Sequence, residues 1–137
     1  MADQFPQMTP LVPRQLINGG EVTLRAAAAL TLAYVASQAM CCPQAGDVDI
    51  SLDFTKGSTT GMKFYIEESE DNVTFMPVGY VDGTRTIVID EIALGAATAT
   101  FLYRATKRRP WMRVQAKGLT DIAGSSLTIK AKPYFAG

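Results

Sequence analysis

A strict alternation of apolar and polar residues over 47–55 constrains the fold more than any other feature of this chain. Apolar side chains occupy every second position, which are Val48, Ile50, Leu52 and Phe54. Because successive side chains of a β-strand point to opposite faces of its sheet, the pattern predicts a strand with one buried and one solvated face. The same period recurs in three later segments, which are 62–66, 112–116 and 127–131.

Turn signals divide the rest of the chain into further short strands. Asp82-Gly83 lies between two strand-like segments and predicts a β-hairpin, and Gly57 lies in a loop where a positive φ angle is expected. The predicted strands are near 47–55, 61–68, 73–81, 85–92, 99–106, 111–117 and 125–132. The sequence therefore predicts an all-β protein, an antiparallel β-sandwich or jelly roll of about eight strands.

Residues 21–40 fit two structures. The segment 25–30 is rich in alanine and has a high helix propensity. The apolar residues of 22–36 nevertheless keep a period of two, and the remainder of the chain is predicted to be β. We therefore favour one long strand or two short strands here over a helix.

Residues 1–20 differ from the rest of the chain in composition. Prolines at 6, 10 and 13 remove backbone donors and favour an extended conformation. We predict an extended N-terminal arm over 1–20, followed by one β-sandwich domain over 21–137. Apolar side chains of the arm are candidate contacts with its own domain or with an adjoining copy; they are Phe5, Leu11, Val12, Leu16 and Ile17.

Charge and hydropathy restrict the class of partner. The chain has 137 residues and a formal net charge of +0, which disfavours nucleic-acid binding because that function normally needs an excess of basic residues. No segment reaches the roughly 18 consecutive apolar residues of a membrane span. The first residues, 1–13, lack the basic start and apolar centre of a secretory signal. We expect neither nucleic acid nor a membrane as partner.

The residue types needed for common catalytic and metal sites are scarce. Histidine is absent, which removes the commonest general base and the commonest metal ligand. Asp47, Asp49 and Asp53 share one face of a predicted strand, which a solvated outer face explains better than a cation site. A second acidic cluster, predicted to be a hydrated turn, consists of Glu67, Glu68, Glu70 and Asp71. We expect no enzyme, no cofactor and no metal site.

The chain has one basic run, Lys107-Arg108-Arg109. Three basic residues are few for binding a phosphate backbone, so we predict an exposed hairpin tip or a charged contact with another subunit. Trp111 alternates with Met112 of the apolar row and is therefore expected to face outward, where it could anchor a protein interface. The candidate subunit contacts in this region are Arg108, Arg109 and Trp111.

The two cysteines, Cys41 and Cys42, are adjacent in the sequence. A disulfide between neighbours would close a strained ring, so none is expected between them. Two unbonded thiols are favoured, and a disulfide to another copy or another subunit is the alternative.

Three consecutive segments carry a recognisable order of strand and turn. They are Asp53-Phe54-Thr55-Lys56-Gly57-Ser58, the strand at 62–68, and Ser69-Glu70-Asp71-Asn72-Val73-Thr74-Phe75. This order resembles small β-sandwich structural proteins of tailed bacteriophages, in which a DFTKGS-like turn precedes a strand and an S-x-D-G-x-x-W/F turn. Asn72 stands where glycine is usual in that turn, and Phe75 where tryptophan is common. Residues 110–116 and 127–131 are similar to the late strands of these proteins.

The resemblance implies a structural virion protein that assembles in many copies, as a head decoration or cement protein or as a neck, collar or tail component. Implied partners are copies of the chain and other virion proteins (capsid, portal, neck or tail), and the implied location is the virion after synthesis in the host cytoplasm. The arm and exposed strand edges are the expected contacts. The alternative is a binding module for carbohydrate or a host receptor, which predicts aromatic side chains gathered on one loop face. The candidates are Trp111, Tyr103, Tyr80, Tyr134 and Phe135.

Overall fold

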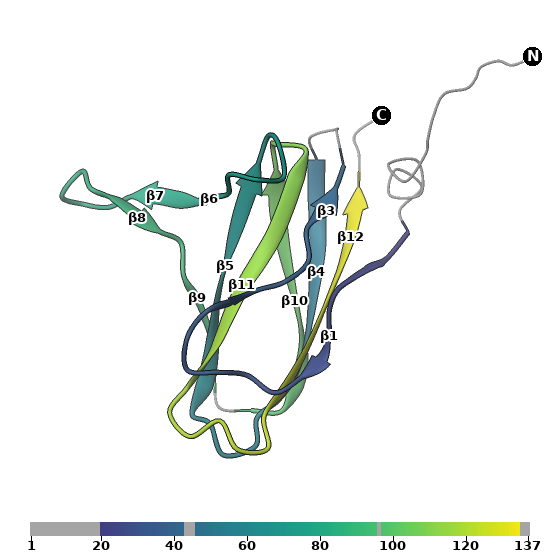
Figure 1. Ribbon diagram of the computed structural model, residues 1–137. Coiled ribbons are helices and arrows are strands. Elements are labelled where there is room, and N and C mark those ends of the chain that lie inside the picture. The colour runs from purple at the N-terminus through teal and green to yellow at the C-terminus, as the bar shows by residue number, and fades with distance from the viewer. Residues whose placement is uncertain (1–19, 43–45, 96, 135–137) are drawn as a thin grey trace, which may run out of the picture.

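The computed structural model describes residues 20–42, 46–95 and 97–134, and within these ranges the chain forms strands and no helix (Figure 1). The early strands are β1 (Val22–Ala28), β2 (Val35–Ala36), β3 (Met40–Cys41), β4 (Gly46–Thr55), β5 (Gly61–Ser69) and β6 (Met76–Pro77). The later strands are β7 (Gly79–Val81), β8 (Ile87–Ile89), β9 (Ile92–Leu94), β10 (Ala99–Lys107), β11 (Trp111–Leu119) and β12 (Ser126–Tyr134).

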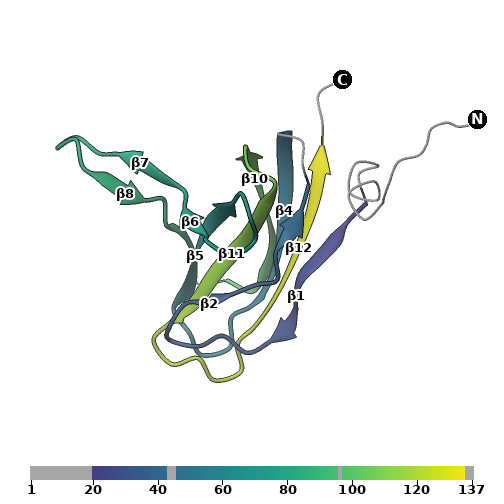
Figure 2. The same ribbon diagram turned by 45° about the horizontal axis from the view of Figure 1, so that its top comes forward.

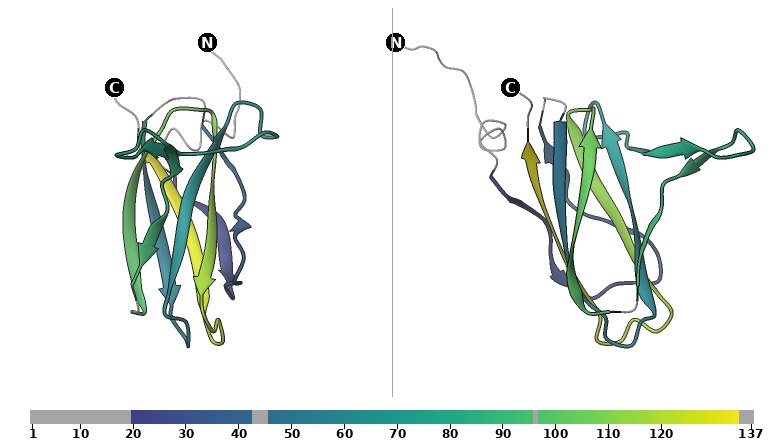
Figure 3. Two further views of the ribbon diagram at one scale, coloured as in Figure 1. Left: turned by 90° about the vertical axis from the view of Figure 1, so that its left-hand side faces the viewer. Right: turned by 180° about the vertical axis from the view of Figure 1, so that it is seen from behind.

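Ten of these strands form two antiparallel sheets that pack face to face, as the right-hand view of Figure 3 shows, and β7 and β8 form a separate two-stranded sheet. The first sheet has the order β1-β12-β4-β10. In the second sheet β11 and β5 lie at the centre; β2 and β3 both pair with β11, and β6 and β9 both pair with β5. The predicted all-β antiparallel sandwich is confirmed.

The pairing order is that of a jelly roll. We count β2 and β3 as one strand position, and β6 and β9 as another. The pairs of strands are then β1 with β12, β2/β3 with β11, β4 with β10, and β5 with β6/β9. This nested pairing of first with last and middle with middle describes one long hairpin rolled into two sheets, which is how a jelly roll is built.

The alternating segments supply the core between the two sheets. Val48, Ile50, Leu52 and Phe54 of β4 are completely buried, and the residues between them face outward. From the facing sheet, Met62 and Phe64 of β5 and Met112 and Val114 of β11 are also fully buried. Burial of this apolar surface is the main favourable contribution to the folded state.

Residues 21–40 form strands, as favoured, although the period of two does not continue through the segment. β1 pairs with β12 in the first sheet, whereas β2 pairs with β11 in the second. The chain therefore crosses from one sheet to the other after Ala28, and a single continuous strand is excluded. Leu30 is buried at this crossing and its backbone N–H donates to Ser125 Oγ, while Leu32 is exposed.

The segments predicted as strands near 73–81 and 85–92 are each broken in two, which corrects the prediction. Only β6 and β9 join the second sheet, whereas β7 and β8 pair with each other. We call residues 79–89 the ribbon. The ribbon projects away from the sandwich in both views (Figures 1 and 2).

The register against β5 shows that the ribbon interrupts one edge strand. Val78 N–H donates to Ile66 O at 2.8 Å, and Ile92 lies opposite Phe64. A single residue, opposite Tyr65, would therefore connect Val78 to Ile92 in a continuous strand. The chain places residues 79–91 there instead.

Candidate protein-contact site

The ribbon exposes large apolar side chains on both of its faces. Opposite residues of an antiparallel pair share a face, so the pairs Val81–Ile87 and Gly79–Ile89 lie on one face and Tyr80–Val88 on the other. Ile87 is 78% exposed, Val81 64% and Tyr80 52%. The ribbon therefore offers apolar surface that nothing in the described part of the molecule covers.

The tip of the ribbon is organised by one carboxylate. Asp82 Oδ1 accepts hydrogen bonds from Thr84 N at 2.8 Å, Thr84 Oγ1 at 2.7 Å and Thr86 N at 3.0 Å. These bonds, with that of the Thr84 hydroxyl as the largest cause, lower the pKa of Asp82. The hairpin predicted from Asp82-Gly83 is confirmed, but Arg85 (φ 63°) rather than Gly83 takes the positive φ angle.

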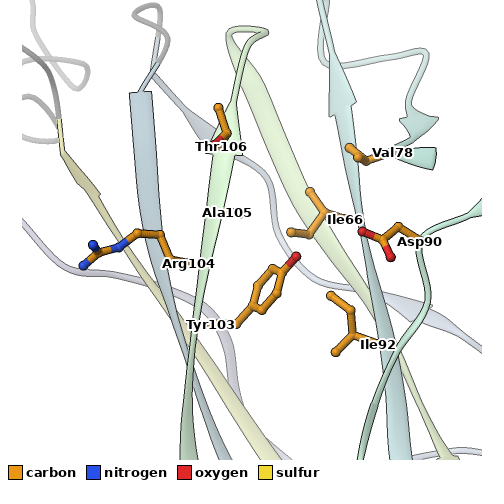
Figure 4. Close-up of a pocket in the computed structure, with 8 residues that line it drawn as sticks. All are labelled: Ile66, Val78, Asp90, Ile92, Tyr103, Arg104, Ala105 and Thr106. Atoms are coloured by element: carbon orange, nitrogen blue, oxygen red, sulfur yellow. The ribbon is translucent and has the colours of Figure 1, made fainter. Parts of the chain in front are cut away.

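At the root of the ribbon a pocket opens between the edges of the two sheets. Asp90 N–H donates to Val78 O at 3.0 Å and closes the ribbon at this end. The hydroxyl of Tyr103 and the carboxylate of Asp90 both point into the pocket, whose apolar lining includes Ile66 and Ile92 (Figure 4). Burial first, and then the charge of Asp90, raises the pKa of Tyr103.

The basic run is a turn between β10 and β11, and one of its members is not at the surface. Lys107 is 1% exposed, and its Nζ donates to the carbonyl oxygens of Cys42 and Arg109. The prediction of an exposed tip is therefore wrong for Lys107. Arg108 and Arg109 are exposed, and the Arg109 guanidinium pairs with Glu70 at 2.7 Å.

The acidic cluster beside this turn is also partly buried, which corrects the predicted hydrated turn. Glu68 is 7% exposed, and its Oε1 accepts the backbone N–H groups of Arg108 at 3.0 Å and Arg109 at 2.8 Å. Glu67 is equally buried and pairs with Arg113 at 2.7 Å. The Glu68 carboxylate therefore joins β5 to the β10–β11 turn, and the Glu67 carboxylate joins β5 to β11.

The outer face of the second sheet is covered by its own side chains. Arg113 lies 3.9 Å from the centre of the Phe75 ring, and Gln115 Nε2 donates to Glu67. The rings of Tyr34 and Tyr65 meet edge to face, with centroids 4.7 Å apart. Because these side chains contact one another, this face offers less uncovered apolar surface to a partner than the ribbon does.

The acidic residues of β4 lie on the solvated outer face, as predicted. Each faces a partner on β10: Asp49 forms two hydrogen bonds with Arg104, at 2.7 and 3.2 Å, and Thr100 and Thr106 reach Asp53 and Asp47. The bond from Arg104 is the largest cause of the lowered pKa of Asp49. The part of the chain that the structure describes contains no group of three or more residues suited to hold a metal ion.

The remaining predicted contacts have mixed outcomes. Phe5, Leu11, Val12, Leu16 and Ile17 lie outside the described residues. Trp111 is half-buried on the side of β11 opposite to Met112, as expected. Neither Cys41 nor Cys42 forms a disulfide within the part of the chain that the structure describes. Cys42 is completely buried, so its sulfur is not presented at the surface, and an inter-subunit disulfide stays a prediction for the half-buried Cys41.

The aromatic candidates of a binding module do not gather on one loop face. Tyr103 packs edge to face against Phe64, with centroids 5.5 Å apart, and Tyr80 lies on the ribbon. Trp111 starts β11 and Tyr134 ends β12. Phe135 lies outside the described residues. The feature that the binding-module alternative requires is absent among the four candidates that the structure describes.

The sequence contained a signal for the ribbon that the strand prediction did not use. Ile87-Val88-Ile89 is a continuous apolar run, whereas a strand on a half-buried sheet alternates. A short run that is apolar on both faces, next to an Asp-Gly turn, does not have the pattern of a half-buried strand.

Comparison with protein-family models finds no match, and neither curated proteins nor solved structures match the chain. The described residues form no helix long and apolar enough to cross a membrane.

Proposed function

We propose that this protein is a structural subunit that assembles in many copies, and that it is a virion protein of a tailed bacteriophage. The observation that carries the proposal is the exposed ribbon at 79–89. The resemblance of the turns at 53–58 and 69–75 to phage β-sandwich proteins supports the virion assignment.

An isolated ribbon of this kind needs a partner. Two-stranded hairpins are marginally stable in water, and contiguous apolar surface on a soluble protein is typical of a contact site. The ribbon has only a few paired residues, and its side chains make little contact with the sandwich. Association with another protein surface would bury Ile87, Val81 and Tyr80 and stabilise the ribbon at the same time.

The remainder of the surface is compatible with close packing of many copies. The formal net charge is +0, so neighbouring copies repel one another little over long distances. A specific contact must bury roughly 1,000 Å² or more. The ribbon, its root and the expected arm together provide separate elements from which such contacts can be built.

The register against β5 defines a precise test. Replacing residues 79–91 with one threonine should join Val78 to Ile92 in a continuous edge strand and leave the jelly roll intact. We expect the full-length chain to form oligomers in sedimentation velocity, and the replaced chain to be a folded monomer by circular dichroism and sedimentation. A full-length chain that stays monomeric, or a replaced chain that assembles equally well, would contradict the proposal.

The virion assignment has its own measurement. Mass spectrometry of purified phage particles should detect the protein in many copies per particle. Its absence from particles produced by cells that express it would refute that part of the proposal.

A further inference from the structure

We propose that the outer edge of β8 pairs antiparallel with β8 of a second copy about a two-fold axis, so that two ribbons form one four-stranded sheet. The proposal rests on the proposed function and names its first contact. It follows from the hydrogen-bonding pattern of the ribbon, from its side-chain faces, and from two charges at its ends.

The backbone of β8 directs N–H and C=O groups away from β7 along one edge. Asp82 N–H donates to Thr86 O, and Asp90 N–H donates to Val78 O, so the even-numbered residues of this strand bond to β7. Hydrogen-bonding direction alternates along an antiparallel strand. The N–H and C=O groups of Ile87 and Ile89 therefore point away from β7, and such an edge is a template for another strand. The Ile89 carbonyl also accepts the N–H of Glu91 at 2.9 Å.

With a two-fold axis, one register uses the outward backbone groups of both Ile87 and Ile89. With Val88 opposite Val88 of the partner subunit, Ile87 lies opposite Ile89 of the partner subunit, and Ile89 opposite the partner's Ile87. In each pair the Ile89 N–H group can donate to the Ile87 carbonyl across the axis. The Ile87 N–H group can donate to the second lone pair of the Ile89 carbonyl, whose first accepts Glu91 N–H. The isoleucines of both copies then share one face with Val81, which joins the apolar surfaces of the two ribbons.

The same register brings opposite charges together. Arg85 and Glu91 of the partner subunit each lie two residues beyond the paired strands and come to the same end of the joined sheet, once on each side of the axis. Within the described chain Arg85 forms no ion pair, and Glu91 accepts a hydrogen bond from the Tyr34 hydroxyl. Exposed pairs of this kind contribute modestly to affinity but select the register and the partner.

The other edge of the ribbon is less suited to pairing. β7 presents Gly79 and Val81 outward, and glycine weakens a strand because it contributes no side chain to pack. β8 consists of three β-branched residues, which have high strand propensity. We therefore assign the contact to β8.

The test is a charge exchange between two variants of the full-length chain. In a homodimer of Arg85→Glu, two acidic groups face each other at both ends, and in a homodimer of Glu91→Arg two basic groups do. Each variant alone should dimerise about tenfold more weakly than the wild type. An equimolar mixture should recover wild-type affinity, because both facing pairs are then of opposite sign. Tyr34→Phe is the matched control for the loss of the Tyr34–Glu91 bond and should dimerise normally.

A second measurement tests the axis directly. Residues opposite each other in a non-hydrogen-bonded pair have Cα atoms about 4.5 Å apart, within the range that a disulfide spans. Val88→Cys should therefore give a covalent dimer on oxidation, whereas Val81→Cys, on the strand away from the axis, should give no more than the wild type.

The outcomes separate this inference from the proposed function. Recovery in the mixture together with the Val88→Cys dimer supports pairing of β8. If the full-length chain assembles through the ribbon but the mixture shows no recovery and Val88→Cys forms no covalent dimer, pairing of β8 is wrong and the proposed function stands. If the chain with residues 79–91 replaced assembles as the wild type does, both are overturned.

Discussion

Val81 and Ile87 lie directly opposite each other across the ribbon, and both are mostly exposed to solvent, at 64% and 78%. On the inner faces of the two sandwich sheets, by contrast, apolar side chains of paired strands are buried. A pair of this kind contributes little to the stability of the monomer and can contribute strongly to association.

Replacing both residues with threonine should therefore separate assembly from folding. Val81→Thr combined with Ile87→Thr keeps β-branched side chains, and we expect the free energy of unfolding to change by no more than about 1 kcal/mol. Oligomers should be lost in sedimentation velocity. Leu102→Thr, at a position on β10 that is 69% exposed, is the matched control and should assemble normally. Equal loss of assembly in the control would show that exposed apolar area in general is responsible.

Acid should loosen the ribbon tip. The folded-state pKa of Asp82 is lowered, so its contribution to the tip is present above the ordinary value of about 3.9 and is lost as the pH falls through the lowered pKa. In an NMR titration the amide signals of Thr84 and Thr86 should shift with a midpoint below 3.9. In Asp82→Asn the two amides should show no such titration. A midpoint at or above the ordinary value would contradict the hydrogen bonds described for the tip.

Gly57 should tolerate no side chain. Its φ angle is +58°, and a Cβ atom would lie 2.4 Å from Ala123 O and 2.6 Å from Ser125 N. We expect Gly57→Ala to lower the free energy of unfolding by about 3 kcal/mol, measured by urea denaturation. Gly83→Ala is the matched control, because a Cβ there meets nothing within 4 Å, and it should change stability by no more than about 0.5 kcal/mol.

Lys107 should make the stability of the protein rise with alkaline pH. Burial lowers its pKa in the folded state, so between that value and the ordinary value of about 10.4 the unfolded chain binds more protons. The free energy of unfolding of the wild type, relative to that of Lys107→Met, should therefore increase as the pH rises towards the ordinary value of about 10.4.

At neutral pH, Lys107→Met should itself be destabilising, by about 1–3 kcal/mol, because the carbonyl groups of Cys42 and Arg109 lose this donor. Lys130→Met, at a half-exposed side chain, is the matched control and should have little effect. A pH dependence identical in wild type and Lys107→Met would contradict the lowered pKa.

Much of the sandwich could be predicted from local pattern. The alternation through Val48 and Phe54 specifies a strand with one buried face, and it holds wherever that face meets a second sheet. Gly57 takes the positive φ angle that its loop was expected to need. These predictions succeed because side-chain direction along a strand depends on the backbone alone.

Local pattern failed where long-range contacts decided the outcome. Nothing near Lys107 in the sequence indicates that its ammonium group is buried beneath carbonyls of Cys42 and Arg109, because Cys42 is distant in the chain. Glu68 likewise looks like a surface residue until the β10–β11 turn places two backbone N–H groups against it.

The sequence by itself determined that this chain is an antiparallel all-β protein, because a period of two leaves one face of each strand in need of cover. Only the tertiary structure decided which strands pair, and that residues 79–91, which include the ribbon, leave the edge strand beside β5. The physical reason is that the pattern of a strand indicates that one of its faces must be buried, but it does not indicate which other strand or sheet covers that face. The partner is chosen by register. Val78 and Ile92 flank the single position opposite Tyr65, which cannot hold residues 79–91, so these residues lie outside the sandwich.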